Sequence, residues 1–391
     1  MSYPVVRVKR GMAGRLARGH PWAFSNEIDM TAAAKALEPG SLIRLTSHEG
    51  RPFGPAFFHP HSLIAARRIG APGDSIDEAF FTATLTRALR LRQRLIEAPF
   101  YRLVHAEADG LPGLIVDRYG EALVVQANSA GADRHLAAIT AALQTSLAPK
   151  TLILRLDTAA REQEGLPREV RVVGAAPAGP VQVTENEVIG LADLMGGQKT
   201  GWFFDHRPNR AVAARLARGA SVLDLCSYTG AFALHAANAG AKSVLALDRD
   251  AAALALAQDA AARNHVAIET RQGDLFDTAE ALAAEGARFD MVLADPPAFV
   301  KSRKALKSGL KGYEKLTRLA ARLTAPDGVL MIASCSQPVD MATLQEQVAN
   351  GLARAGRTGR ILIAGGAGPD HPTHPMLPES AYLKAIFLAL D

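Results

Sequence analysis

Cysteine is scarce in this chain of 391 residues, which contains only Cys226 and Cys335. Two thiols in a chain of this length cannot form a disulfide framework or a four-cysteine zinc site. We therefore expect both cysteines to be free thiols in a reducing compartment, and we expect no bound metal.

Long apolar runs are also missing. Arg, Asp or Gln interrupts the hydrophobic stretches well before the roughly 18 residues that a membrane-spanning helix needs. The N-terminus carries Arg7, Lys9 and Arg10 without the apolar core of a signal peptide. With 48% hydrophobic and 21% charged residues, the composition is that of a globular protein of two or three domains. We expect a cytoplasmic protein without membrane contact.

Residues 1–72 predict a small β-rich domain, because short extended runs such as 4–8, 41–46 and 62–69 alternate with Gly and Pro. Residues 1–70 hold ten Lys and Arg against four acidic residues, a surplus larger than the net charge of +5 of the whole chain. This surplus favours nucleic acid as a partner.

Four cations of the first domain directly precede a group of rings: they are Lys9, Arg10, Arg15 and Arg18, followed by His20, Trp22 and Phe24. RNA-binding modules combine such features, since phosphates need charge and bases need faces to stack on. For the rings, packing in the small core is the alternative that we prefer. For the cations we expect RNA binding.

Residues 73–180 predict a small α+β middle domain. A helix is expected over residues 76–96, with Leu85, Leu89, Leu91 and Leu95 on one broad face. A second helix is expected at 133–146, strands are expected at 103–106, 113–119, 122–127 and 151–156, and a linker is expected within 161–180. Nothing here has the spacing of a catalytic set, so we interpret this domain as a spacer or platform.

From residue 181 to residue 391, strands and helices alternate, which predicts a doubly wound, mainly parallel α/β sheet. We expect strands at 222–225, 243–248, 267–271, 291–295 and 329–334. We expect helices at 231–238, 251–264, 278–285, 313–323 and 341–354.

Four of these strands end on polar or turn residues, and the carboxyl ends of parallel strands form the ligand-binding edge of such a sheet. The first turn, Asp-Leu-Cys-Ser-Tyr-Thr-Gly at 224–230, holds one glycine, so the three-glycine fingerprint of dinucleotide binding is absent. Asp248 is placed to accept both ribose hydroxyls, and Asp274 to accept an adenine amine. Acids without a phosphate cradle suit S-adenosylmethionine better than NAD or ATP.

Each of these acids alone is also explained as a helix cap, but four in register are not. The cofactor-binding residues expected at this edge are Asp224, Cys226, Ser227, Tyr228, Thr229, Gly230, Asp248, Arg249, Asp274, Leu275, Asp295 and Pro297.

The order of these motifs, followed by Ser-Cys-Ser at 334–336, resembles class I S-adenosylmethionine-dependent methyltransferases. Specifically, it is similar to the bacterial family of ribosomal RNA large subunit methyltransferase I, which makes 5-methylcytosine in 23S ribosomal RNA. The likeness covers nearly the whole chain, because residues 8–24 resemble that family's N-terminal PUA domain, residues 105–114 resemble its middle domain, and residues 198–207 and 370–384 also fit. It implies an RNA-anchoring first domain and adds four expected cofactor-binding residues, Gln198, Phe204, Asp205 and Arg207.

The thiol of Cys335 follows an apolar run, 329–333, that predicts a buried strand ending at the ligand edge. Cytosine C5 is too poor a nucleophile to take a methyl group directly, whereas addition of a thiolate at C6 makes C5 enamine-like. The resemblance implies that Cys335 is this nucleophile and that Asp295 holds the ring N3 and the amino group of the base. No cysteine follows Pro297, so a one-cysteine mechanism is expected, and the sequence does not indicate the base that removes the C5 proton.

Two alternatives concern the thiols. Cys335 could be a small buried hydrophobe, as free cysteines often are. Cys226 lies on the first-strand turn, where we interpret it as a packing or cofactor contact.

A basic stretch follows Asp295-Pro296-Pro297, and only Glu314 opposes it: Lys301, Arg303, Lys304, Lys307, Lys311 and Lys315. Such a run is often only a solvated face. Because it adjoins the expected target pocket, we predict that Lys301, Arg303, Lys304 and Lys307 bind RNA phosphates with a strong salt dependence.

Two rival functions stay open. Asp-Pro-Pro-aromatic sequences can hold an exocyclic amine for direct methylation without any cysteine. Alternatively, the chain could be a non-catalytic RNA-binding factor in ribosome assembly. A dehydrogenase is disfavoured by the missing glycines. The target nucleotide and the oligomeric state, with a homodimer as one option, are not fixed by the sequence.

Overall fold

A computed structural model describes residues 3–391, which divide into two compact units. Unit 1 contains the residues up to Gly179 together with Asp193–Trp202 and Pro369–Ser380. Unit 2 contains Pro180–Ala192, Phe203–Gly368 and Ala381–Asp391. No helix within residues 3–391 is both long and apolar enough to cross a membrane.

The first sheet of unit 1 has five strands in the order β1-β3-β4-β5-β2. Alternate residues of its strands, such as Ile43 and Leu45 on β3, fill a small core of their own. The expected strand at 41–46 is confirmed, whereas only three residues of the expected run 62–69 are extended. The elements are β1 (Val5–Arg7), α1 (Gly14–Ala17), β2 (Trp22–Ala23), α2 (Ala32–Lys35), β3 (Ser41–Thr46), β4 (Pro52–Phe58) and β5 (Ala66–Arg68).

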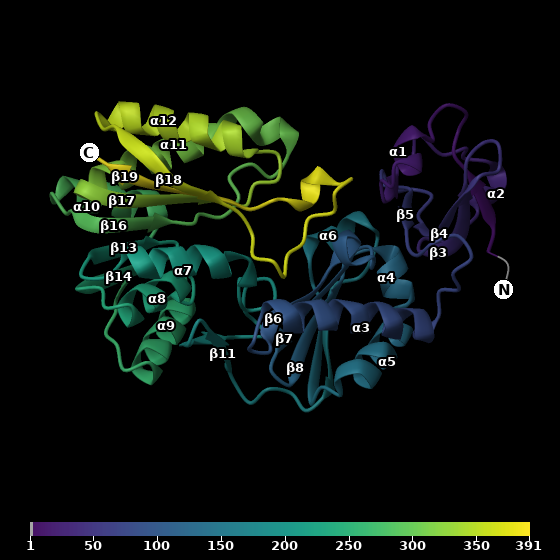
Figure 1. Ribbon diagram of the computed structural model, residues 1–391, viewed down its shortest axis with the longest axis horizontal. Coiled ribbons are helices and arrows are strands. Elements are labelled where there is room, and N and C mark those ends of the chain that lie inside the picture. Colours follow the sequence, from purple (N-terminus) through teal and green to yellow (C-terminus); the bar gives the residue numbers. More distant parts are fainter. Residues whose placement is uncertain (1–2) are drawn as a thin grey trace. The chain divides into compact units, whose positions relative to one another are not determined.

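The second sheet of unit 1 has the order β10-β9-β8-β7-β6, and α3 and α5 pack on it, as Figure 1 shows. The expected strands of this region are confirmed to within a few residues. Its elements are α3 (Glu78–Leu95), β6 (Phe100–His105), η1 (Ala106–Asp109), β7 (Leu114–Tyr119), β8 (Ala122–Ala127), α4 (Ala130–Arg134), α5 (Leu136–Leu147), β9 (Thr151–Leu156), α6 (Ala159–Gln163) and β10 (Glu169–Gly174).

One expectation for this region is wrong in detail. The expected helix at 133–146 is divided at His135, where the backbone leaves the helical region between α4 and α5. A linker was expected within 161–180; the edge strand β10 occupies Glu169–Gly174 and pairs antiparallel with β9 over six residues, and residues 164–168 and 175–180 on either side of it contain no helix or strand.

The apolar face expected for α3 is also wrong in part. Leu85 is buried, but Leu91 and Leu95 are 43% and 46% exposed. Arg92 takes the buried position instead, because its guanidinium forms two hydrogen bonds to Asp109, at 2.6 and 2.7 Å. A paired arginine can thus replace a leucine on a buried helix face.

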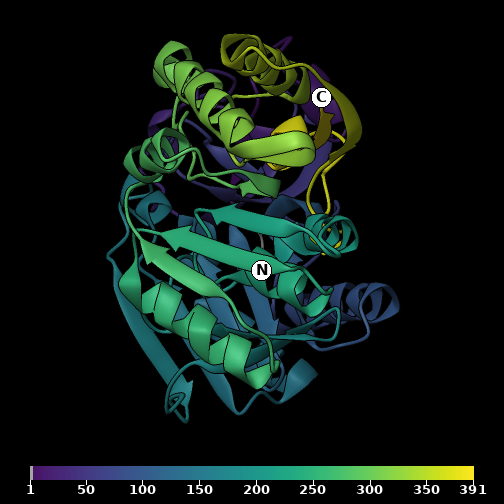
Figure 2. The ribbon, with the colours of Figure 1, turned by 90° about the vertical axis from the view of Figure 1, so that its left-hand side faces the viewer.

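Unit 2 is built on a seven-stranded sheet with the order β15-β14-β13-β16-β17-β19-β18. The first five strands are parallel, and Figure 2 shows strands of this sheet running side by side. Alternate residues of β13 belong to two separate cores: Leu223 and Leu225 pack toward α10, α11 and α12, and Val222 packs toward α7 and α8. Both faces are therefore buried, which explains the continuous apolar runs of these strands.

The expected strands and helices of unit 2 are confirmed to within a few residues, except that α11 and β17 begin earlier than expected. The elements are η2 (Phe204–His206), α7 (Arg207–Leu216), β13 (Ser221–Leu225), α8 (Ala231–Asn238), β14 (Ser243–Asp248), α9 (Ala251–Arg263), β15 (Glu269–Gln272), α10 (Leu275–Ala284), β16 (Phe289–Ala294), η3 (Arg303–Ala305), α11 (Leu306–Leu323), β17 (Thr324–Ser334) and α12 (Met341–Ala355).

Several elements were not expected from the sequence. They are the hairpin β11 (Val181–Glu185) and β12 (Val188–Ala192), helix α7, and the two final strands β18 (Gly359–Gly365) and β19 (Lys384–Leu390); the short turn η4 (Pro378–Ser380) belongs to unit 1. β19 inserts antiparallel between β17 and β18. It thereby places Lys384 opposite Ser334 at the end of β17.

Candidate active site

The topology of the unit 2 sheet changes direction at β13, which pairs with β14 on one side and with β16 on the other. Open α/β sheets bind their ligands at the carboxyl ends of the strands beside such a point. Burial raises the pKa of the Cys226 thiol well above its ordinary value, and four carboxylates raise it further: Asp248, Asp295, Asp224 and Asp274. The four acids expected from the sequence therefore lie around one point.

Asp224 lies at the end of β13 with a carboxyl group that is 1% exposed. Its Oδ2 accepts a hydrogen bond from Ala233 N at 3.0 Å, but no group within residues 3–391 binds its buried Oδ1. Burial raises the pKa of Asp224 well above its ordinary value; the Ala233 hydrogen bond lowers it, and the Asp295 and Asp248 carboxylates raise it. A buried acceptor of this kind costs free energy unless a ligand supplies a donor.

The turn from β13 into α8 has an unusual backbone. Cys226 and Tyr228 have φ values of 62° and 51°, in the left-handed region that side chains other than glycine rarely adopt. Gly230 also has a positive φ, of 73°, and a Cβ there would lie 2.7 Å from the Cβ of Ala257. Such strain is typical of functional turns.

Two hydroxyl groups of this turn, Ser227 Oγ and Thr229 Oγ1, are buried without a hydrogen-bond partner in the described chain. Together with Asp224 Oδ1 they are three buried polar atoms that a ligand could satisfy.

Asp248 ends β14, where it is 8% exposed. Its Oδ2 accepts from Tyr228 N at 2.8 Å and its Oδ1 accepts from Asp250 N at 2.9 Å. The cap of α9 is Asp250, not Asp248, which removes the alternative of a helix cap for Asp248. The neighbouring Arg249 is exposed.

Asp274 is a helix cap, since its Oδ1 accepts from Phe276 N at 2.8 Å and from Asp277 N at 3.3 Å at the start of α10. The alternative explanation therefore holds for this acid. Leu275 is half-buried, and the Phe276 ring stacks on Phe299 with centroids 5.9 Å apart.

Asp295 follows β16, and its Oδ2 lies 3.1 Å from His206 Nε2. Asn209 fixes the tautomer of this histidine. Because Asn209 Nδ2 donates to the carbonyl of Gly366 at 3.1 Å, the same amide group donates to His206 Nδ1, also at 3.1 Å. His206 Nδ1 is then the acceptor, so Nε2 carries the proton and donates it to Asp295. Pro296, next in sequence, is buried, and Pro297 is exposed.

The residues expected to bind cofactor between 198 and 207 fall in different units. Gln198 belongs to unit 1, whereas Phe204, Asp205 and Arg207 belong to unit 2. Phe204 is buried, and Asp205 accepts a hydrogen bond from the Tyr382 hydroxyl.

Arg207 lies 3.5 Å from Glu185 Oε2, beside a second arginine that binds the same carboxylate. This second arginine is Arg210, which donates through Nη2 to Glu185 Oε2 at 2.9 Å. The side chains of Arg210 and Glu185 are both at most 1% exposed. The pair holds the hairpin β11–β12 to α7.

Cys335 follows β17 directly and is half-buried. Its two serine neighbours bind one phenol: Ser334 Oγ donates to Tyr313 Oη at 2.8 Å, and Ser336 Oγ lies 2.8 Å from the same atom. Val300 N also donates to Ser336 Oγ, at 3.0 Å. The turn that carries the thiol is thus fixed on both sides.

A buried cation lies beside this turn. Lys384 is 5% exposed, and its Nζ donates to the carbonyls of Ser336 and Tyr382, both at 2.7 Å. Burial lowers the pKa of Lys384 to about 8, while negative charge at Cys335 and Asp340 raises it. The ammonium group and the Cys335 thiol are therefore within electrostatic range of each other.

The basic residues of the two expected RNA-binding groups are mostly exposed: Lys9, Arg10, Arg18, Lys301, Arg303, Lys304 and Lys307. Arg15 differs, because it binds Glu27 at 2.7 Å and stacks over Phe24. Trp22 donates its Nε1 to Glu107 at 2.7 Å. The ring is half-buried and is not part of the core of the first sheet, so the expected packing of Trp22 in that small core is not what the structure shows.

Four polar residues of the site were not singled out from the sequence: His206, Asn209, Tyr313 and Lys384. Lys384 left a usable signal, since it is a lone charge at the start of an apolar run, Ala-Ile-Phe-Leu-Ala-Leu. His206 lies in the stretch 198–207 that resembles the family, but its pairing with Asp295 left no signal, because the two residues are 89 positions apart and only the fold brings them together.

Comparison with known proteins gives two family matches and several full-length relatives. Residues 6–70 match the model of a PUA-like domain, and residues 167–361 match that of an S-adenosylmethionine-dependent methyltransferase. The ribosomal RNA large subunit methyltransferase I of Shewanella denitrificans is 34% identical over 389 residues, which cover 97% of this chain and 98% of the relative. The enzyme of the same name from Pseudoalteromonas atlantica is 35% identical over 388 residues, with the same shares covered.

Solved structures share the fold. A protein from Streptococcus mutans assigned as an S-adenosylmethionine-dependent methyltransferase has a TM-score of 0.83 at 20% identity, covering 99% of this chain and all of that one. A protein assigned as a methyltransferase and complexed with SAH has a TM-score of 0.84 at 20% identity, covering both chains fully. A PUA-like domain with a class I methyltransferase domain, the fold class expected from the sequence, is thus confirmed.

Proposed function

Because the chain belongs to the ribosomal RNA large subunit methyltransferase I family, an S-adenosylmethionine-dependent family, we propose that it methylates C5 of a cytosine in 23S ribosomal RNA. In this proposal Cys335 is the covalent nucleophile and Asp295 orients the base. The three parts expected from the sequence, residues 1–72, 73–180 and 181–391, then act as RNA anchor, platform and catalytic domain. An RNA substrate of this kind places the reaction in the cytoplasm.

The turn after β13 supports the cofactor assignment. Three buried polar atoms, Asp224 Oδ1, Ser227 Oγ and Thr229 Oγ1, have no partner in the described chain and fit a ligand with several polar groups. Asp248, which is not used as a helix cap, is the candidate for the ribose hydroxyls. When bound, S-adenosylmethionine supplies a methyl group on a positively charged sulfur, which the surrounding carboxylates favour electrostatically.

Cys335 begins the reaction that we propose. Its thiolate adds to C6 of the cytosine, and the electron pair of the C5–C6 bond moves to C5. C5 would then form a bond to the methyl carbon of the cofactor while the methyl–sulfur bond breaks, and the sulfur would leave with that electron pair as a neutral thioether. Loss of the C5 proton to a base returns an electron pair to the ring, the C5–C6 double bond forms again, and the thiolate leaves. The enzyme thiolate is regenerated, so one cysteine is sufficient.

Asp295 has a role in the same proposal. His206 Nε2–H occupies Asp295 Oδ2, which leaves Oδ1 to accept a hydrogen bond from the exocyclic amino group of the base. The chain of hydrogen bonds from Gly366 through Asn209 and His206 fixes the carboxylate orientation.

The main support for the proposal is the difference between the electrostatic surroundings of the two thiols. Burial and four carboxylates raise the pKa of Cys226, so this thiol stays protonated and is a poor nucleophile. Cys335 instead lies beside the Lys384 ammonium, which favours a thiolate.

Covalent trapping tests the proposal. RNA that contains 5-azacytosine should form a stable adduct with the wild type and with Cys226→Ala, and mass spectrometry of the peptides should find it on Cys335. Cys335→Ala should form no adduct and should not methylate. Full methylation by Cys335→Ala would instead indicate the rival reaction at an exocyclic amine, and failure of the wild type to bind S-adenosylmethionine in equilibrium dialysis would contradict any methyltransferase function.

A further inference from the structure

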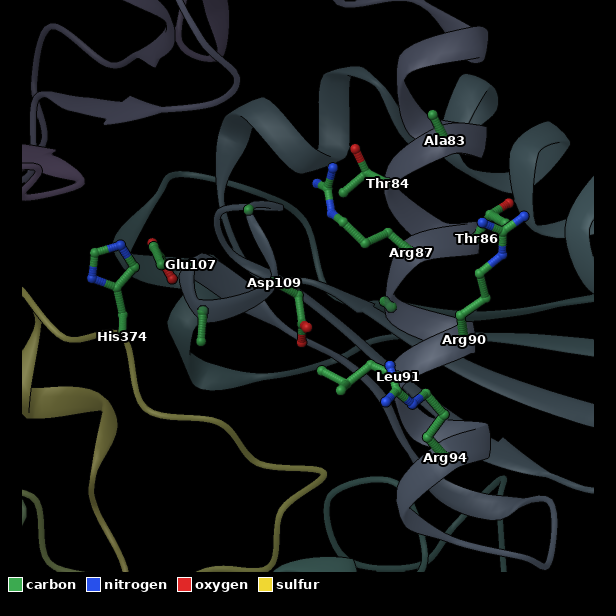
Figure 3. Close-up of a pocket in the computed structure, with 13 residues that line it drawn as sticks. Ala83, Thr84, Thr86, Arg87, Arg90, Leu91, Arg94, Glu107, Asp109 and His374 are labelled. Atoms are coloured by element: carbon green, nitrogen blue, oxygen red, sulfur yellow. The ribbon is translucent and has the colours of Figure 1, made fainter.

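A cavity of about 960 Å³ in unit 1 is lined largely by one face of α3. Figure 3 shows Arg87, Arg90 and Arg94 on this helix, with Glu107 and Asp109 from η1 and His374 from the 369–380 segment. The proposed methyl transfer uses none of these residues. Their arrangement indicates a second kind of binding surface.

The three arginines share one face of the helix, because their spacing of three and four residues equals about one turn each. All three are exposed, and none forms an ion pair within residues 3–391; the arginine of α3 that does so is Arg92. At a rise of 1.5 Å per residue, Arg87 and Arg94 span about 10 Å along the helix.

The two acids that line the cavity do not neutralise these cations. Asp109 is bound by both Nη atoms of Arg92, at 2.6 and 2.7 Å. Glu107 Oε1 accepts from Arg67 at 3.0 Å and from Trp22 Nε1 at 2.7 Å. Asp109 is thus offset by Arg92, and Glu107 shares Arg67 with Glu164, whose Oε1 lies 3.3 Å from Arg67 Nη2.

His374 adds no negative charge, and burial lowers the pKa of its imidazole, so it is neutral near pH 7. The lining holds three arginines and two acids, and both acids are ion-paired with arginines outside the lining, so the positive charges of Arg87, Arg90 and Arg94 are left without a carboxylate partner in the lining. Leu91, 43% exposed, lies between them and offers an apolar contact for a sugar or a base.

We infer that Arg87, Arg90 and Arg94 bind consecutive phosphates of the substrate RNA, which makes the middle of unit 1 a binding surface rather than a spacer. This inference rests on the proposed function for the existence of an RNA substrate. The length of the arginine row favours a strand over a single phosphate ion, because a nucleic-acid strand places a charge every few ångström along its axis. Guanidinium groups also suit phosphate oxygens in geometry.

The test compares RNA affinity at two salt concentrations by filter binding, with unmodified 23S ribosomal RNA fragments that the wild type methylates. The variant replaces all three arginines with glutamine. Three lost phosphate contacts should reduce the salt dependence so that the affinity ratio of wild type to variant is about 20- to 40-fold larger at 50 mM than at 200 mM salt. A variant with three lysines should restore most of this dependence, since it keeps the charge.

A matched control removes three cations of unit 1 that already have carboxylate partners. Lys150, Arg168 and Arg171 are exposed and pair with Glu121, Glu162 and Glu169. Their replacement by glutamine should change the salt dependence much less. An equal effect in both triple variants would show a general charge effect and overturn the inference.

Further outcomes separate the inference from the proposed function. Wild-type protein that does not bind the RNA would contradict the proposed function itself. Wild-type protein that binds, with unchanged affinity and salt dependence in the glutamine variant, would overturn the inference alone. So would thermal stabilisation by inorganic phosphate that the variant loses without any change in RNA binding, because the site would then hold a free anion.

Discussion

Lys384 should control the reactivity of Cys335, and Lys384→Gln removes its charge. The lysine is 5% exposed and donates to the carbonyl of Ser336, the residue after the thiol. Since the pKa of Lys384 is about 8, roughly nine in ten molecules carry the ammonium at pH 7. Because the Lys384 ammonium and Cys335 interact electrostatically, removal of the positive charge should lower the thiolate fraction, by about tenfold for a close opposite charge.

The assay is alkylation of the thiol by iodoacetamide in a Cys226→Ala background, followed by mass spectrometry between pH 6.5 and 9.5. At pH 7 the glutamine variant should react about tenfold more slowly than the parent. The ratio of the two rates should fall toward unity as the pH rises through 8, because the lysine then loses its own proton. Lys384→Arg should keep the fast rate at high pH.

Two results would refute this reasoning. One is an unchanged rate in the glutamine variant at pH 7. The other is a rate ratio that does not vary between pH 6.5 and 9.5, which would mean that Lys384 acts only by holding the turn through its bonds to two carbonyls.

Three further changes have defined outcomes. Asp224→Asn should raise the free energy of unfolding at pH 7 by about 1 kcal/mol. The reason is that the pKa of Asp224 is raised in the folded protein, so the aspartate stabilises the fold only at low pH and loses this contribution as the pH rises above about 4. The same change should weaken S-adenosylmethionine binding at least tenfold in calorimetry. His206→Phe should lower kcat about 10- to 100-fold with little change in the KM for cofactor, and His206→Gln should recover part of it, because an amide can still donate to Asp295. Glu185→Gln should lower the free energy of unfolding in urea by about 3–5 kcal/mol, because it leaves Arg210 buried without its carboxylate; a loss below 1 kcal/mol would contradict a structural role for this pair.

The edge of the sheet on which the site lies was predictable from the sequence. The alternation of strands and helices predicts a parallel sheet, and the carboxyl ends of parallel strands lie at the same edge. The acids at 224, 248, 274 and 295 follow such strand ends, so they were expected at that edge. The sequence could not separate their local roles. In the folded protein Asp274 caps α10, while Asp250, not Asp248, caps α9.

The polar partners of these residues were not predictable. His206 ends η2 and Asp295 follows β16, so only the fold of unit 2 brings them together, and no periodic pattern in the sequence predicts this contact. The outward position of Leu91 was missed for a related reason: helical spacing places Arg92 and Leu85 on one face, and the preference for an arginine there depends on Asp109, 17 positions away. Pairing over such separations is decided by tertiary contacts rather than by local propensity.

The return of residues 369–380 to unit 1 has a consequence for how the chain matures on the ribosome. Arg92 on α3 and Arg102 on β6 bind Asp370 through its carbonyl and its carboxylate, both at 3.0 Å. Thr200, from the other returning segment, binds Asp117 at 2.6 Å. Unit 1 therefore lacks part of its buried polar network until residues 369–380 have been synthesised. During synthesis we expect unit 1 to be less stable than in the finished protein. Its remaining hydrogen bonds should form at about the time when β19, a strand of the methyltransferase sheet, is synthesised.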